Sequence, residues 1–217
     1  MITCASVVGQ KTNKGRKLNV FCFSKFKIMK RLTFMTSLIL VTFVSSLSAQ
    51  TEAEQKAWQA YMTPGEAHKF LVASAGDWTE QITMWMDPGA PPTKTTTTSK
   101  SEMIMGGRYL VSKTTGNMMG MPFEGMSIMG FDNAKKVYTS TWIDNLGTGV
   151  ISMEGTWDEA TKSVNFKGKG VDPMTGKEVM MRQVIKVIDN DTQEFHMYDN
   201  KNGKEVKTME IKSVRKK

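Results

Sequence analysis

The sequence has little cysteine or histidine and no long apolar run. Its 217 residues include two cysteines, Cys4 and Cys22, and two histidines, His68 and His196. Both cysteines lie within the first 28 residues, so residues 50–217 contain none. That part of the chain therefore has no disulfide, no thiol catalysis and no cysteine-based metal site. A domain without disulfides depends on its core for stability, and about 168 residues suffice for one well-filled core.

Acidic residues are absent before Glu52. The full chain has 29 basic and 21 acidic residues, for a net charge of +8, and eight of the basic residues precede residue 50. The remainder therefore carries 21 charges of each sign and is neutral. Because the basic excess lies in the leading segment, the net charge does not indicate nucleic-acid binding, and we expect no nucleic-acid partner.

Residues 29–49 have the pattern of a secretory signal peptide. Lys30 and Arg31 provide a positive start, and Leu38–Val44 is the centre of an apolar region too short to span a bilayer comfortably. Leu47-Ser48-Ala49 ends in a small residue suited to cleavage. The pattern predicts export to the periplasm or the extracellular space, without stable membrane insertion after cleavage. An uncleaved anchor is the alternative.

The chain divides at the sequence level into four segments. Residues 1–28 precede a complete signal peptide that has its own Met29, and we interpret them as an over-extended start or a disordered stretch. The alternative is a basic targeting extension. Residues 50–76 are predicted to be a helical segment, and residues 77–217 a β-barrel domain.

Helix signals are confined to the segment before Gly76. Thr51 with Glu54 forms a capping-box pattern, and Thr63-Pro64 is a helix-start pattern for a second helix. From Gly76 onward, short alternating runs separated by turn residues predict ten strands. These are Trp78–Met86, Lys94–Met105, Arg108–Thr115, Phe123–Phe131, Val137–Asp144, Gly149–Trp157, Ser163–Gly170, Glu178–Ile188, Gln193–Tyr198 and Val206–Val214.

Ten short strands with tight connections indicate an antiparallel meander. Closure of such a meander removes exposed edges. We therefore predict an all-β fold: a single antiparallel up-and-down β-barrel of about 8–10 strands with one or two short N-terminal helices. A barrel of this size has room for one small ligand.

Gly76-Asp77-Trp78, at the switch from helix to strand, resembles the G-x-W entry of lipocalin-type barrels. In those barrels the Trp closes one end and an Arg near the last strand packs over it. Trp78 and Arg215 are the matching structural candidates here.

Five further motifs resemble the uncharacterised bacterial family called domain of unknown function 1579. They are GGRYLV at Gly106–Val111, G-x-PFEG at Gly120–Gly125, GFDNAKKVYTSTWID at Gly130–Asp144, DPMTGK at Asp172–Lys177 and MEIKSVRK at Met209–Lys216. The resemblance covers residues 67–217 and implies a lipocalin-like, calycin-type barrel in an exported or cytosolic protein. Phe131 and Ser213 depart from the residues common in the family at those positions. The family has no established reaction, so the resemblance implies no catalytic residue.

Methionine is unusually abundant, with 16 of the 19 residues after the predicted cleavage site and seven of them in Met103–Met129. The first interpretation is flexible core filling or a pocket wall. The alternative is a copper site built from thioethers, for which Met84/Met86, Met103/Met105 and Met118–Met121 have suggestive spacing.

Polar residues on strands supply the remaining candidates. Tyr138, Ser140, Trp142 and Asp144 share one face of a strand, a mixture that suits a mostly apolar ligand pocket. Arg108 and Arg182 would need partners such as Asp144 or Glu210 if they faced inward, and outward they are ordinary surface charges. Thr95–Ser99 is predicted to be a solvated strand with weak register.

The two histidines have alternative interpretations. His196 shares a strand face with Glu194 and Tyr198, and is either a haem ligand inside the barrel or an exposed strand residue. His68 is expected to be exposed or to belong to a lid over the barrel mouth.

The sequence favours a barrel that binds a small apolar or amphipathic molecule, with no cofactor assigned and the oligomeric state open. The candidate ligand-binding residues are Tyr138, Ser140, Trp142, Asp144, Arg182, His196, Arg108, Met119 and Trp85. One alternative is an enzyme of unknown reaction in the same cavity, although no catalytic constellation stands out. The other is a structural or partner-binding module without a ligand.

Overall fold

The structure is a computed structural model that describes residues 51–86, 91–201 and 203–217, without the side chain of Lys201. The predicted signal peptide at 29–49, residues 1–28 and both cysteines lie outside these ranges. Within them, no helix has the length and apolar character needed to cross a membrane. The barrel lies within the compact unit Lys56–Lys217.

Two short helices precede the strands. Residues 51–62 are helical, and α2 spans His68–Ser74. The predicted second helix begins later than Thr63 because Glu66 and Ala67 form a turn, in which the backbone N–H of Gly65 donates to His68 Nδ1 over 3.0 Å. The buried residues His68, Leu71 and Ser74 give α2 one inward face. The helix ends at Ala75, whose backbone is extended.

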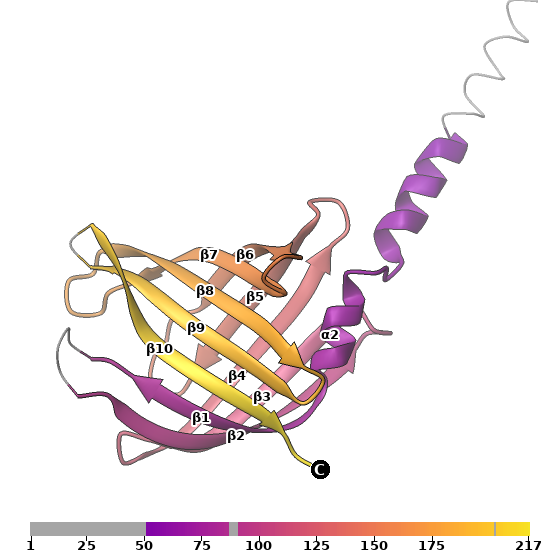
Figure 1. Ribbon diagram of the computed structural model, residues 1–217. Coiled ribbons are helices and arrows are strands. Elements are labelled where there is room, and N and C mark those ends of the chain that lie inside the picture. Colours follow the sequence, from indigo (N-terminus) through magenta and orange to yellow (C-terminus); the bar gives the residue numbers. More distant parts are fainter. Residues whose placement is uncertain (1–50, 87–90, 202) are drawn as a thin grey trace, which may run out of the picture. The chain divides into compact units, whose positions relative to one another are not determined.

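Ten antiparallel strands form a closed barrel in which β1 pairs with both β2 and β10, and all other strands pair with their sequence neighbours (Figure 1). The strands are β1 Gly76–Met84, β2 Thr93–Ile104, β3 Tyr109–Met118, β4 Met121–Asp132, β5 Val137–Asp144, β6 Ile151–Asp158, β7 Ser163–Val171, β8 Glu178–Asp189, β9 Thr192–Lys201 and β10 Lys204–Arg215. The predicted all-β, single antiparallel up-and-down barrel with short N-terminal helices is confirmed.

The core consists of two clusters of inward-facing side chains. One cluster, built around Leu71, Tyr138 and Phe166, lies at the end of the barrel where β1 begins and α2 packs. We call this the closed end (Figure 1). The other cluster contains Ile82, Met84, Met118 and Phe123 and lies toward the opposite end, which we call the open end. Side chains alternate between the inside and the outside along each strand, so the register decides which residues can meet a ligand.

Candidate functional site

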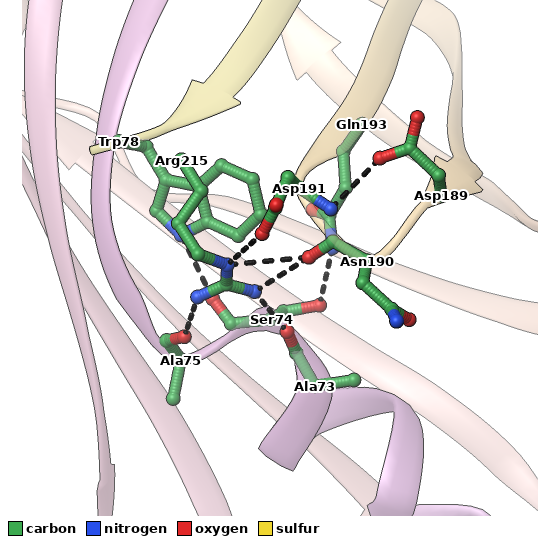
Figure 2. A network of polar contacts seen from close by, with 9 residues as sticks. All are labelled: Ala73, Ser74, Ala75, Trp78, Asp189, Asn190, Asp191, Gln193 and Arg215. Carbon is green, nitrogen blue, oxygen red and sulfur yellow. Dashed lines mark hydrogen bonds and ion pairs between the residues drawn. The ribbon is translucent and has the colours of Figure 1, made fainter. Parts of the chain in front are cut away.

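A network around Arg215 and Trp78 secures the closed end (Figure 2). The Arg215 guanidinium carbon lies 4.2 Å from the centroid of the Trp78 ring. Arg215 Nη1 donates to the carbonyl of Ala75 over 2.5 Å, and Nη2 to that of Ala73 over 2.7 Å. Nε and Nη2 also donate to the carbonyl of Asn190. One side chain therefore joins the end of α2, the β8–β9 turn and the last strand.

The polar atoms beside this cation are also paired. Trp78 Nε1 donates to the Ser74 carbonyl over 3.1 Å, and Gln193 Nε2 donates to Ser74 Oγ over 2.9 Å (Figure 2). Gly76 has a φ of +132°, and a Cβ there would clash with Arg215 Nη1. The junction between α2 and β1 therefore requires glycine, because other residues rarely adopt this conformation and the guanidinium fills the space.

The lumen beyond the closed end contains accessible space. The register places five side chains of β8–β10 inside the barrel, and each remains partly exposed. They are Met181, Phe195, Met197, Met209 and Ile211. By contrast, Val164 and Phe166 on β7 are 0% exposed. Inward side chains of a closed barrel retain exposure where the interior is not completely filled, so accessible surface remains along the β8–β10 wall.

Hydroxyl groups line the adjoining wall formed by β1–β3. Thr97 Oγ1 and Ser99 Oγ each donate to the carboxylate of Glu80 over 2.8 Å. Ser101 and Ser112 form a further hydroxyl pair at 2.7 Å. The prediction that Thr95–Ser99 is a solvated strand is wrong, because Thr97 is 1% and Ser99 6% exposed. The sequence contains one signal that Glu80 faces inward. It lies on β1 midway between Trp78 and Ile82, two apolar residues of the same strand face.

The four predicted residues of β5 face inward but lie at different depths. The Tyr138 hydroxyl donates to the Ala67 carbonyl over 2.8 Å, and burial raises the pKa of Tyr138. Tyr138 thus packs beneath α2 as part of the closed end. Trp142 stacks against Phe123 with ring centroids 6.4 Å apart, and its Nε1 donates to Asp144 Oδ2 over 2.7 Å. Trp142 and Asp144 lie toward the open end, with Ser140 between them and Tyr138.

Arg182 does not line the lumen, which corrects the prediction. It pairs in register with Lys167, on the outward side of β7. Its guanidinium donates twice to the Glu205 carboxylate over 2.7 Å and lies 3.9 Å from the Tyr198 ring centroid. The hydrogen bonds between Arg182 and Glu205 raise the pKa of Arg182 and lower that of Glu205. The partner of Arg182 is therefore Glu205, and not Asp144 or Glu210.

His196 also lies on the outer face, because Phe195 and Met197 occupy the inward positions of β9. His196 Nε2 is 3.7 Å from a carboxylate oxygen of Glu194 and 3.7 Å from one of Glu210. This position does not suit the proposed haem ligand inside the barrel.

Trp85, Arg108 and Met119 also lie away from the lumen wall. Trp85 follows the inward Met84, and Lys207 Nζ on the outer face lies 5.3 Å from its ring centroid. Arg108 Nη2 donates to the Met62 carbonyl over 2.6 Å and so caps the preceding helix. Met119 occupies the turn between β3 and β4 and is 54% exposed.

Two of the three methionine groups predicted for copper are separated, whereas Met118 and Met121 pair in register across the β3–β4 hairpin. Met84 is buried, but Met86 is 59% exposed because β1 ends at Met84. Met105 lies in the β2–β3 turn and is likewise exposed, unlike Met103. In the described parts of the chain, no group of three or more His, Cys, Asp or Glu residues could hold a metal ion. The inward methionines of the barrel include Met84, Met103, Met118, Met121, Met129, Met153, Met181, Met197 and Met209.

A separate groove of about 860 Å³ lies beside α2 at the closed end. Its lining includes the aromatic residues Phe70, Phe131, Tyr138 and Trp157 and the lysines Lys136 and Lys162. His68 stands nearby on the inward side of α2. His68 is buried where α2 covers the closed end, and this burial lowers its pKa.

Residues 63–215 match the family described as "Protein of unknown function (DUF1579)", and the chain belongs to this family. The predicted resemblance is therefore confirmed. The fold is a lipocalin-like barrel.

Several solved structures are similar to this chain, including the following two. Rv2717c from M. tuberculosis has a TM-score of 0.54 and 14% identity, covering 71% of this chain and all of its own. The S-type phycobiliprotein lyase CPES from Guillardia theta has a TM-score of 0.49 and 12% identity, covering 70% of this chain and 93% of its own. No curated protein matches this chain.

Proposed function

We propose that the protein binds a small apolar or amphipathic molecule in the barrel lumen, entering from the open end. The observation that carries this proposal is the partial exposure of inward side chains on β8–β10 in a barrel that is closed around its circumference. A barrel whose core filled the lumen would bury them all. The barrel fold is compatible with binding a small molecule.

The lining suits an apolar body with a few polar groups. Methionines adapt to ligands of different shape, and Trp142 with Phe123 provides a rigid aromatic wall. Asp144 and the hydroxyls around Glu80 supply polar contacts that would fix orientation. The candidate ligand contacts are therefore Ser140, Trp142 and Asp144 from the predicted set, together with the wall of β8–β10.

We also propose that the protein is exported. The support is the signal-peptide pattern at residues 29–49 of the sequence. N-terminal sequencing of the protein from the extracytoplasmic fraction should give a start at Gln50, and an intact leader there would contradict cleavage.

A substitution that fills the lumen tests the binding proposal. Ser140 faces inward on β5, and its neighbour Thr141 faces outward. Saturable binding of the neutral apolar dye N-phenyl-1-naphthylamine to the wild type is expected. Ser140→Phe should weaken this binding tenfold or more, because about 1.4 kcal/mol of lost contact already gives a factor of ten. Thr141→Phe adds the same ring outside and should leave binding unchanged. Equal binding of the dye by the wild type and both variants would show that the dye binds outside the lumen.

A further inference from the structure

The charged side chains that face the lumen are mainly acidic. In the described strands, Glu80, Asp144 and Asp199 occupy inward positions of β1, β5 and β9. The inward cation Arg215 is engaged at the closed end, and Lys204 is exposed at the open rim. Other strand lysines occupy outward positions, and these include Lys100, Lys113, Lys167, Lys169, Lys186 and Lys212.

Glu80 is the best-positioned of these carboxylates. Its two oxygens accept one hydrogen bond each, from Thr97 and Ser99, whose hydroxyls are buried and fix its orientation. A carboxylate has about four acceptor positions, so it retains capacity for further donors. Among the described residues, Glu80 forms no ion pair with a lysine or arginine. An oriented carboxylate in a partly enclosed site, without a protein cation, is suited to a cationic donor from a ligand.

The wall above Glu80 is apolar. Ile82 and Met84 continue the same face of β1 toward the open end, and Trp142, Met209 and Ile211 pack around them. A ligand whose head reached Glu80 would therefore place its body against methionine, isoleucine and tryptophan. From this arrangement we propose that the lumen selects cationic amphiphiles, molecules with an ammonium or amidinium head bound by Glu80 and an apolar tail. The inference rests on the proposed lumen-binding function.

The acidic groups of the lumen also disfavour ligands with a negatively charged head. Apart from Lys204 at the rim, the charged groups that a carboxylate head would meet at mid-height and toward the open end are themselves carboxylates, and like charges in a partly enclosed space repel strongly. A neutral alcohol head would form a hydrogen bond with Glu80 but would lack the attraction between opposite charges. The expected order of affinity is amine, then alcohol, then carboxylate.

Three probes with one tail and different heads test this order: decylamine, decan-1-ol and decanoate. Each is titrated at neutral pH, below its micellar concentration, against full-length processed protein carrying the neutral dye. In the wild type, decylamine should displace the dye at a concentration at least about tenfold lower than decan-1-ol does, because a hydrogen bond to a charged group is worth roughly that factor. Decanoate should be the weakest of the three.

The matched variant is Glu80→Gln, which keeps side-chain size and can still pair with Thr97 and Ser99. It should weaken decylamine about tenfold and leave decan-1-ol unchanged. Glu102→Gln removes an outward carboxylate from β2 and should change none of the three. Thermal unfolding of each variant checks that the barrel is intact.

The outcomes separate this inference from the function on which it rests. If the dye and all three probes bind but the head group makes no difference in the wild type, the cationic preference is overturned and lumen binding stands. The same holds if Glu80→Gln folds and binds decylamine as tightly as the wild type. If neither dye nor probe binds, both proposals fail. The ranking in the wild type needs no variant, so it tests the cationic preference of the lumen even if Glu80→Gln does not fold.

Discussion

Arg215 joins three parts of the closed end through one guanidinium. It contacts the Trp78 ring and donates to the carbonyls of Ala73, Ala75 and Asn190. A leucine could replace its apolar contact but would leave three carbonyls without their charged donor, and the bond to the Ala75 carbonyl is partly buried. Loss of that bond is more costly than loss of an exposed ion pair, because the remaining partner is partly desolvated.

We expect Arg215→Leu to lower the free energy of unfolding by about 3 kcal/mol, from hydrogen bonds to a charged group and the cation–π contact. Chemical denaturation measures this change. Lys100→Leu, an outward lysine on β2, is the control and should have little effect. Comparable destabilisation by the two variants would show that Arg215 does not hold the closed end.

Helix α2 packs over the closed end of the barrel and contains the buried residue His68. Burial of His68 lowers its pKa below the ordinary 6.5, and the positive charge of Arg108 lowers it further. The folded state therefore binds fewer protons at this site than the unfolded state. The contribution of His68 is fully present above pH 6.5 and is lost as the pH falls through the lower pKa of the folded protein.

The expected result is a free energy of unfolding that declines as the pH falls below 6.5. His68→Asn keeps an acceptor for the Gly65 N–H but does not titrate there, so its stability should vary less over the same interval. Denaturant unfolding of both proteins at several pH values provides the measurement. Parallel pH profiles would mean that protonation of His68 is not coupled to folding.

The same helix shows how far local sequence signals extend. Pro64 and the Thr63 pattern predict a start near residue 63, but the side chain of His68 closes the preceding turn and α2 begins at His68. The strands were more predictable, since turn residues bound each of them. Val137–Asp144 has the predicted bounds, and the other strands differ at their ends by up to three residues.

Across the barrel, the sequence predicts which residues share a face better than which face is inside. β9 illustrates the reason. Its two faces, Phe195 with Met197 and His196 with Tyr198, both contain large partly apolar side chains, so alternation alone does not choose between them. The long-range register with β8 and β10 makes that choice and puts His196 outside. On β5 the contrast between faces was larger, and Trp142 and Asp144 were found in the interior.

Glu80 was missed for a related reason. Charged residues are usually exposed, so a glutamate on a strand is taken as an outward residue. The hydroxyls of Thr97 and Ser99, distant in sequence, make the inward position acceptable, and only the pairing of β1 with β2 brings them together.

The central claim is that an amphipathic molecule enters the lumen and reaches Trp142. Quenching of tryptophan fluorescence by decan-1-ol brominated at its tail tests this most directly, because bromine quenches only at close range. We expect saturable quenching in the wild type that is largely lost in Trp142→Phe and retained in Trp85→Phe, whose ring lies on the outer face. Quenching that never saturates, or that survives in Trp142→Phe, would contradict a ligand site in the lumen.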